Sequence, residues 1–180
     1  MTPPRYAPSQ KVLHWAVAAL VFALVPIALA MANLPDGALK NALYEWHKSL
    51  GLTVLGLAVA RLLVRAARGA PALVEGLPAW QRRAARASHR ALYLLIVLVP
   101  LLGWAGTSVC CAPVMLYSTV PLTLPISGGM PVGETILTVH QVAAFALVAL
   151  VVAHVAAALH HHLVRRDGTL RRMWWGRGEG

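Results

Sequence analysis

The stretch TVHQVAAFALVALVVAHVAAALHHHL, residues 138–163, decides how this chain folds. It is long enough for a membrane-spanning helix, which needs about 20 predominantly apolar residues. It nevertheless carries His140 and His154 deep inside the apolar run and three more histidines at its end. A polar ring in hydrocarbon is costly unless something binds it, so these histidines predict a bound partner.

The composition indicates an integral membrane protein. Of the 180 residues, 58% are hydrophobic and 12% are charged, which is outside the range typical of soluble proteins. The net charge of +10 does not indicate a nucleic-acid partner, because the basic residues cluster beside apolar runs with little aromatic interleaving. The two cysteines are the adjacent Cys110 and Cys111, so a CxxCH motif for covalent haem is absent, and we expect both thiols to be reduced or structural.

Apolar runs predict the fold class: all-α, an integral membrane four-helix bundle forming one domain over residues 1–180. The four predicted spans are residues 12–32, 44–64, 91–109 and 135–163. The segment 107–134 contains four prolines and a Gly-Gly pair, which predicts an outer loop.

Lysine and arginine predict the orientation of the bundle. With the N-terminus inside, fourteen of the sixteen basic residues fall on inner segments, and only Lys40 and Lys48 lie outside. We therefore expect both termini to be cytoplasmic. The alternative is that residues 1–32 are a signal peptide, although this apolar run is long for one and contains His14.

The spacing of four histidines predicts two levels in the bundle. His140 and His154 are 14 residues apart, which is nearly four turns and about 21 Å of helix, so both rings leave one helix face at different depths. His14 lies at the inner beginning of the first span, and His47 at the outer beginning of the second. An antiparallel bundle then places His14 with His154 at an inner level and His47 with His140 at an outer level.

Two histidines facing each other at each level are typical of a haem iron bound from both faces. Without a CxxCH motif, we expect two non-covalent b haems. A four-coordinate zinc would need its ligands at one depth. Two alternatives remain: each histidine hydrogen-bonds a neighbouring group, or the chain is a metal or proton transporter that uses intramembrane histidines without haem.

Three further groups are candidates for function. Arg61 is 14 residues after His47 and is expected at the inner level, where it would bind a haem propionate or else extend to the inner headgroups. His161 and His89 lie near the inner surface and would hydrogen-bond a quinone and exchange its protons, or else are solvated interfacial residues. Glycines would let helices or a porphyrin approach closely, and the candidates are Gly51, Gly56, Gly103 and Gly106.

Five segments of the chain together resemble the prokaryotic cytochrome b561 family: YAPSQKVLHW, EWHKSLGL, RLLVR, SHRALYLLIVLVPLLGW and VHQVAAFALVALVVAHVAAALHHHLVRRDGTLRRM. The resemblance implies a four-helix protein of the bacterial inner membrane with two b haems. It implies His14 and His154 as ligands of the inner haem and His47 and His140 as ligands of the outer one. It also implies electron transfer between an outer-side donor and the quinone pool, with ubiquinone as the acceptor.

Some members of this family oxidise superoxide on the outer side, which leaves a superoxide:ubiquinone oxidoreductase as an alternative function. That activity would benefit from a basic outer surface, yet the loop 107–134 has no basic residue. Lys48 directly follows a predicted haem ligand and is the candidate on the outer donor side. The sequence identifies neither the donor nor whether the chain forms a homo-oligomer.

Overall fold

The structure is a computed structural model that describes residues 5–74 and 76–175, and within them it contains four long helices and one small hairpin. The elements in chain order are α1 (Pro8–Asn33), α2 (Ala38–Arg68), α3 (Ala79–Cys110), β1 (Met115–Leu116), β2 (Val120–Pro121) and α4 (Gly129–Leu163). All four helices are long and apolar enough to cross a membrane. The prediction of a mostly helical chain with four long apolar helices is therefore confirmed.

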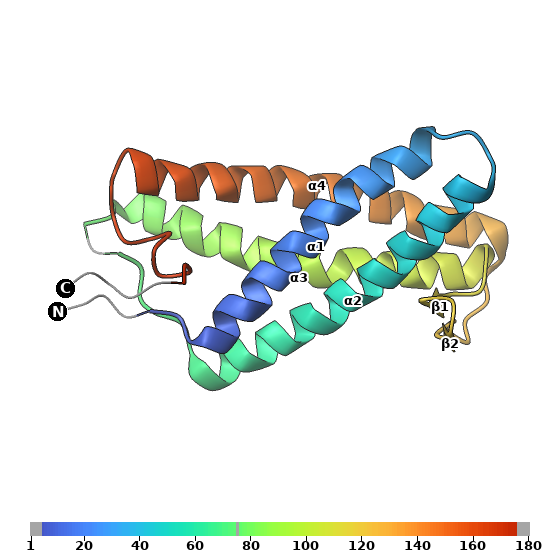
Figure 1. Ribbon diagram of the computed structural model, residues 1–180, viewed down its shortest axis with the longest axis horizontal. Coiled ribbons are helices and arrows are strands. Elements are labelled where there is room, and N and C mark those ends of the chain that lie inside the picture. Colours follow the sequence, from blue (N-terminus) through green and yellow to red (C-terminus); the bar gives the residue numbers. More distant parts are fainter. Residues whose placement is uncertain (1–4, 75, 176–180) are drawn as a thin grey trace.

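Each helix runs antiparallel to the next one along the chain (Figure 1). α1 packs along α2, α3 packs along α4, and α2 packs against α3. Figure 1 shows the α1–α2 pair inclined across the α3–α4 pair. α1 and α4 do not pack directly, so side chains bridge the space between them.

The helices begin earlier than the apolar runs do. α3 starts at Ala79, twelve residues before the predicted boundary, and α4 starts at Gly129 rather than at residue 135. The early turns of α3 contain Arg82, Arg83, Arg86 and Arg90, which are good helix formers but too polar for hydrocarbon. Hydropathy therefore locates the membrane-spanning part of a helix and misses its polar extension.

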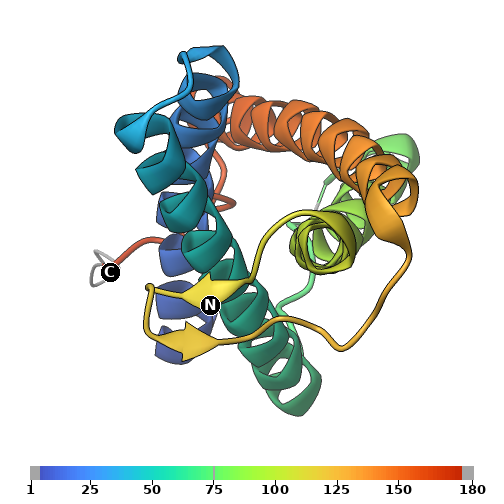
Figure 2. The same ribbon diagram turned by 90° about the vertical axis from the view of Figure 1, so that its right-hand side faces the viewer.

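The predicted loop 107–134 is shorter and more ordered than expected. α3 continues to Cys110, and β1 pairs antiparallel with β2, Met115 opposite Pro121 and Leu116 opposite Val120. Seen from the end of the bundle, the hairpin and its flanking segments lie across the ends of the helices (Figure 2). The expectation of reduced cysteines is wrong, because Cys110 and Cys111 are joined by a disulfide.

Side chains of α2 hold the hairpin. The buried hydroxyl of Ser49 accepts a hydrogen bond from the Tyr117 amide at 2.9 Å and donates to the Met115 carbonyl at 3.3 Å. The Tyr117 hydroxyl lies 2.8 Å from Thr53 Oγ1. Tyr117 and Ser118 both have positive φ, at 49° and 57°, a strained conformation for residues with side chains that these contacts stabilise.

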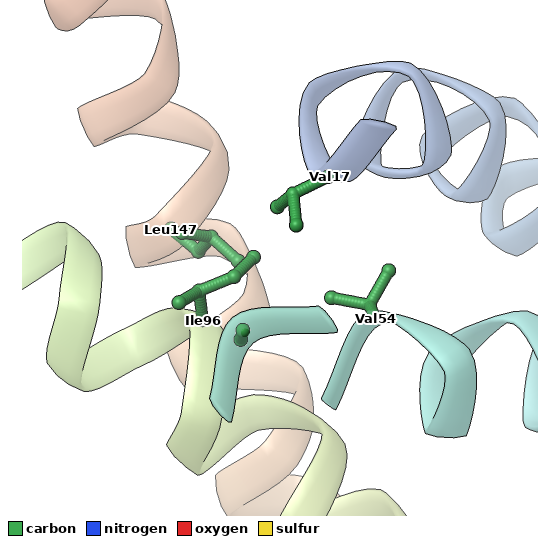
Figure 3. Packing of buried hydrophobic residues seen from close by; sticks show 5 residues of the cluster. Val17, Val54, Ile96 and Leu147 are labelled. Carbon is green, nitrogen blue, oxygen red and sulfur yellow. The ribbon is translucent and has the colours of Figure 1, made fainter. Parts of the chain in front are cut away.

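The only contiguous apolar core in the described part of the chain is a thin layer halfway along the bundle. It consists of Val17, Val54, Ala58, Ile96 and Leu147, contributed by all four helices. Figure 3 shows the labelled side chains pointing toward one another. Leu147 is seven residues from both His140 and His154, so the layer lies about 10 Å from each along α4.

Candidate functional site

The outer level of the bundle brings His47 of α2 opposite His140 of α4. Their ring centroids are 6.3 Å apart and their planes cross at 88°. His140 Nδ1 lies 2.8 Å from the Val99 carbonyl oxygen. A carbonyl only accepts, so Nδ1 carries the proton and Nε2 keeps its lone pair, which is the state of a metal ligand.

Gly103 of α3 makes room for the His140 ring. A methyl group at this glycine would lie 3.0 Å from His140 Cε1 and 3.1 Å from Nδ1. That is tighter than ordinary van der Waals contact, so the ring occupies the space of a side chain. The position of His140 thus depends on α3 through both Val99 and Gly103.

The inner level brings His14 of α1 opposite His154 of α4. Their ring centroids are 6.4 Å apart, and their planes cross at 80°. This contact joins two helices whose backbones do not approach each other closely. His89 of α3 is a third imidazole at this level, with its ring 5.6 Å from that of His154.

Arg61 of α2 lies at the inner level, as its 14-residue distance from His47 predicts. Its charge acts on the rings of His14, His154 and His89. The guanidinium stacks over Tyr93 of α3 at 5.0 Å from the ring centroid. The permanent charge of Arg61 is therefore felt by all three imidazoles of the inner level, and Arg65 also acts on His89.

His161 lies apart from this cluster, at the inner end of α4. Its Nδ1 is 2.5 Å from Asp167 Oδ2, and the Thr169 amide donates to the other carboxylate oxygen at 2.9 Å. Burial raises the pKa of Asp167, but the hydrogen bonds from Thr169 and His161 outweigh it and lower that pKa to about 2. An ionised carboxylate only accepts, so His161 Nδ1 is protonated and Nε2 is the nitrogen free to exchange a proton.

The segment after α4 folds back under the beginning of α1. The indole of Trp15 donates to the Met173 carbonyl at 2.9 Å, and the ammonium of the buried Lys11 donates to the Trp174 carbonyl at 3.1 Å. Trp174 also packs edge-on against Trp15 at 5.5 Å. The sequence analysis did not predict this inner cap, residues 164–175.

Lys48 lies at the outer end of α2, but its charge is largely neutralised. Its ammonium pairs with Glu45 and donates to the Pro113 carbonyl at 3.3 Å, and its side chain is only 13% exposed. The side chain therefore anchors the segment before β1 to α2. It contributes little positive potential to the outer surface.

Comparison with known proteins assigns the family. A family model described as prokaryotic cytochrome b561 matches residues 5–176. The chain belongs to the prokaryotic cytochrome b561 family. It is 32% identical to cytochrome b561 homolog 2 of Escherichia coli over 96% of this chain and 92% of that protein, and 31% identical to cytochrome b561 homolog 1 over 94% and 96%. It is also 27% identical to the probable superoxide oxidase CybB of Yersinia pestis over 94% and 95%.

Family membership makes the chain a multi-pass bacterial membrane protein of electron transfer, with haem b as the implied cofactor. The distance between the two ring centroids of each histidine pair fits this cofactor. Two imidazoles that bind one metal ion from opposite sides, each with its nitrogen about 2 Å from the ion, have ring centroids about 6.3 Å apart. The observed separations are 6.3 and 6.4 Å.

The polar atoms of these rings also fit a bound group. Nδ1 of His14 and Nδ1 of His47 are buried and make no hydrogen bond within the described part of the chain. A buried polar atom without a partner is costly and marks a site that lacks a ligand or a neighbour. The residues of this cytochrome b561 family member are therefore compatible with haem b at both levels.

Proposed function

We propose that this protein binds two b haems and carries electrons between an outer-side donor and the quinone pool. His14 and His154 would be the axial ligands of the inner haem, and His47 and His140 those of the outer haem. The observation that supports this most directly is the separation of both ring pairs, which matches two imidazoles on one iron. The distribution of basic residues supports a cytoplasmic location of both termini, with the protein in the bacterial inner membrane.

Haem b supplies reversible one-electron chemistry at iron between two imidazoles. The chain holds the imidazoles in place: Val99 fixes the tautomer of His140, and Gly103 fixes its position. The apolar layer around Leu147 separates the two levels and excludes water between them. Arg61 would bind a propionate of the inner haem, because its guanidinium interacts electrostatically with the rings of both inner ligands.

Quinone reduction consumes protons as well as electrons, so the inner site needs a group that exchanges them. We assign this role to His161 Nε2, because Asp167 fixes the proton on the other ring nitrogen. His89 is the second candidate, but its ring is packed against His154 inside the bundle. Ubiquinone is the proposed acceptor, and the donor on the outer side is unidentified.

A visible spectrum with a haem count tests the proposal. Purified protein from haem-replete cells should show a reduced b-type spectrum and two haems per chain. A colourless preparation, or one haem per chain, would contradict it. Measuring iron and haem together also distinguishes the cytochrome from a metal or proton transporter without haem.

The second candidate is a superoxide:ubiquinone oxidoreductase, and it is supported by the likeness to the probable superoxide oxidase CybB. The neutralised Lys48 weighs against it, because electrostatic attraction of an anion needs free positive charge. This activity predicts rapid reduction of the haems by superoxide that slows steeply as salt rises. Reduction no faster than the spontaneous reaction would eliminate this candidate.

A further inference from the structure

A groove runs along the outside of the bundle between α2 and α3. It has a volume of about 410 Å³ and is lined by Leu62 of α2 and by Tyr93, Leu94, Val97, Leu98 and Leu101 of α3. Leu94 and Leu101 are 64% and 40% exposed, so the groove opens toward the surroundings of the bundle. From Tyr93 to Leu101 it extends over eight residues of helix, about 12 Å, close to the thickness of one hydrocarbon leaflet.

The inner end of the groove carries two guanidinium groups. Arg61 and Arg65 lie over the ring of Tyr93, at 5.0 and 5.3 Å from its centroid. No Asp or Glu carboxylate pairs with either arginine among residues 5–74 and 76–175. Two guanidinium groups without a carboxylate partner, at the boundary of an apolar groove, make this end of the groove favourable for an anion.

Both arginines act on His89, but only Arg61 also acts on His14 and His154. Arg61 acts on the inner histidines, which assigns it to the interior of the bundle. Arg65 is one helical turn nearer the inner end of α2, about 6 Å along its axis, and shares with the groove the residue Tyr93. An anion bound by Arg65 would therefore lie directly at the inner end of the apolar groove.

We propose that this groove binds an anionic phospholipid of the inner leaflet, with one acyl chain between Leu62 and Leu98 and the phosphate hydrogen-bonded by Arg65. The order of the parts matches such a lipid, because the cation lies toward the inner end and the apolar walls extend toward mid-membrane. A neutral quinone ring would leave the Arg65 charge uncompensated. The inference does not depend on the number of haems or on the quinone.

Native mass spectrometry of the purified, haem-loaded protein in detergent tests the inference with dioleoylphosphatidylglycerol and dioleoylphosphatidylcholine as probes. We expect one phosphatidylglycerol to be retained in preference to phosphatidylcholine. Arg65→Gln should weaken its retention about tenfold or more, the equivalent of one charged hydrogen bond. Leu98→Trp, which fills the groove, should remove the bound lipid.

Two matched variants control for charge and bulk. Arg68→Gln removes an exposed cation three residues further along α2, and Leu63→Trp adds the same ring at a position that is 65% exposed and outside the groove. Both should retain phosphatidylglycerol like the wild type. The haem spectrum of every variant reports folding, so a loss of lipid with an unchanged spectrum supports the proposal.

Three results would overturn it: equal retention of the two lipids, unchanged retention in Arg65→Gln, or displacement of phosphatidylglycerol by decylubiquinone at equal concentration. The last result would make the groove a quinone site. If Leu98→Trp fails to fold, the comparison of the two lipids and the Arg65→Gln variant still test whether the groove binds an anionic lipid. Loss of the electron-transfer proposal would appear separately, as a wrong haem count.

Discussion

Gly103 and His140 show how a single residue can determine the position of a proposed haem ligand. A histidine can bind iron only if its ring is in the right place and its free nitrogen points at the metal. Val99 accounts for the second condition and Gly103 for the first. Of the glycines singled out from sequence, Gly103 and Gly106 have close neighbours, whereas a methyl group at Gly51 or Gly56 would meet no atom within 4 Å.

The first prediction concerns this pair. Gly103→Val should displace the His140 ring and remove the outer haem, because the added methyl groups need the space that the ring occupies. The haem-to-protein ratio should fall from two to one, as it should in His140→Ala. Gly56→Val is the matched control, since nothing lies near its side chain, and it should keep both haems. Retention of both by Gly103→Val would refute the assignment.

A second residue-scale prediction concerns His154. Its replacement by alanine should remove the inner haem and leave the outer one, because it is the proposed α4 ligand of the inner haem.

A third prediction concerns Arg61. The variant Arg61→Gln should lower the midpoint potential of one haem while both haems remain bound. Loss of a nearby positive charge favours the oxidised iron. Redox titration followed optically measures this shift, and equal shifts of both haems would argue against an inner propionate contact.

The histidine pairs could be predicted at the residue scale because helix periodicity converts sequence spacing directly into depth and face. The environment of each ring could not be predicted in this way. The contact of His140 with Val99 spans 41 residues, and the stacking of Arg61 on Tyr93 joins two helices whose rotation is set by packing. Neither leaves a signal in the local sequence.

At the scale of elements, the inner cap depends on one carboxylate. The pKa of Asp167 is lowered to about 2, so the ionised form stabilises the folded state. This contribution is present above about pH 4 and is lost as the pH falls from about 4 to about 2. Near-ultraviolet circular dichroism of the cap tryptophans should show a transition in this range. Asp167→Asn should abolish that transition, whereas Asp36→Asn, at an exposed pair with Lys40, should preserve it.

The outer hairpin provides the second element-scale prediction. Ser49→Ala leaves the Tyr117 amide without its acceptor, so the free energy of unfolding should fall by about 1–3 kcal/mol. Amide hydrogen exchange of residues 115–121 should rise at the same time. Ser118→Ala changes an exposed hydroxyl of the same turn and is the control. Unchanged exchange in Ser49→Ala would show that the hairpin does not depend on α2.

Sequence predicted the four helices but not this hairpin, and the reason is physical. An apolar run of about 20 residues has few alternatives to a membrane helix, because lipid satisfies no backbone hydrogen bond. A two-residue strand pair has little stability of its own. It forms here because Ser49 and Thr53, more than 60 residues away, supply its hydrogen bonds.

At the scale of the whole molecule, the arrangement is two histidine levels separated by a thin apolar layer. The inner cap and the beginning of α1 lie at one end, and the hairpin lies at the other (Figure 1). Because the helix number is even, both described ends of the chain are on one side of the bundle. Which side of the membrane that is follows only from the distribution of lysine and arginine.

The orientation can be tested by cysteine labelling in a background where Cys110 and Cys111 are serine. Cysteines at Ser118 and Arg171, both exposed, mark the hairpin end and the cap end. In intact spheroplasts a membrane-impermeant maleimide should label the first and not the second, because fourteen of sixteen basic residues would resist translocation. After permeabilisation both should react, which controls for burial of the thiols. Labelling of the cap end alone in intact cells would invert the topology, and would place the inner histidine level, Arg61 and the proposed lipid site toward the outside.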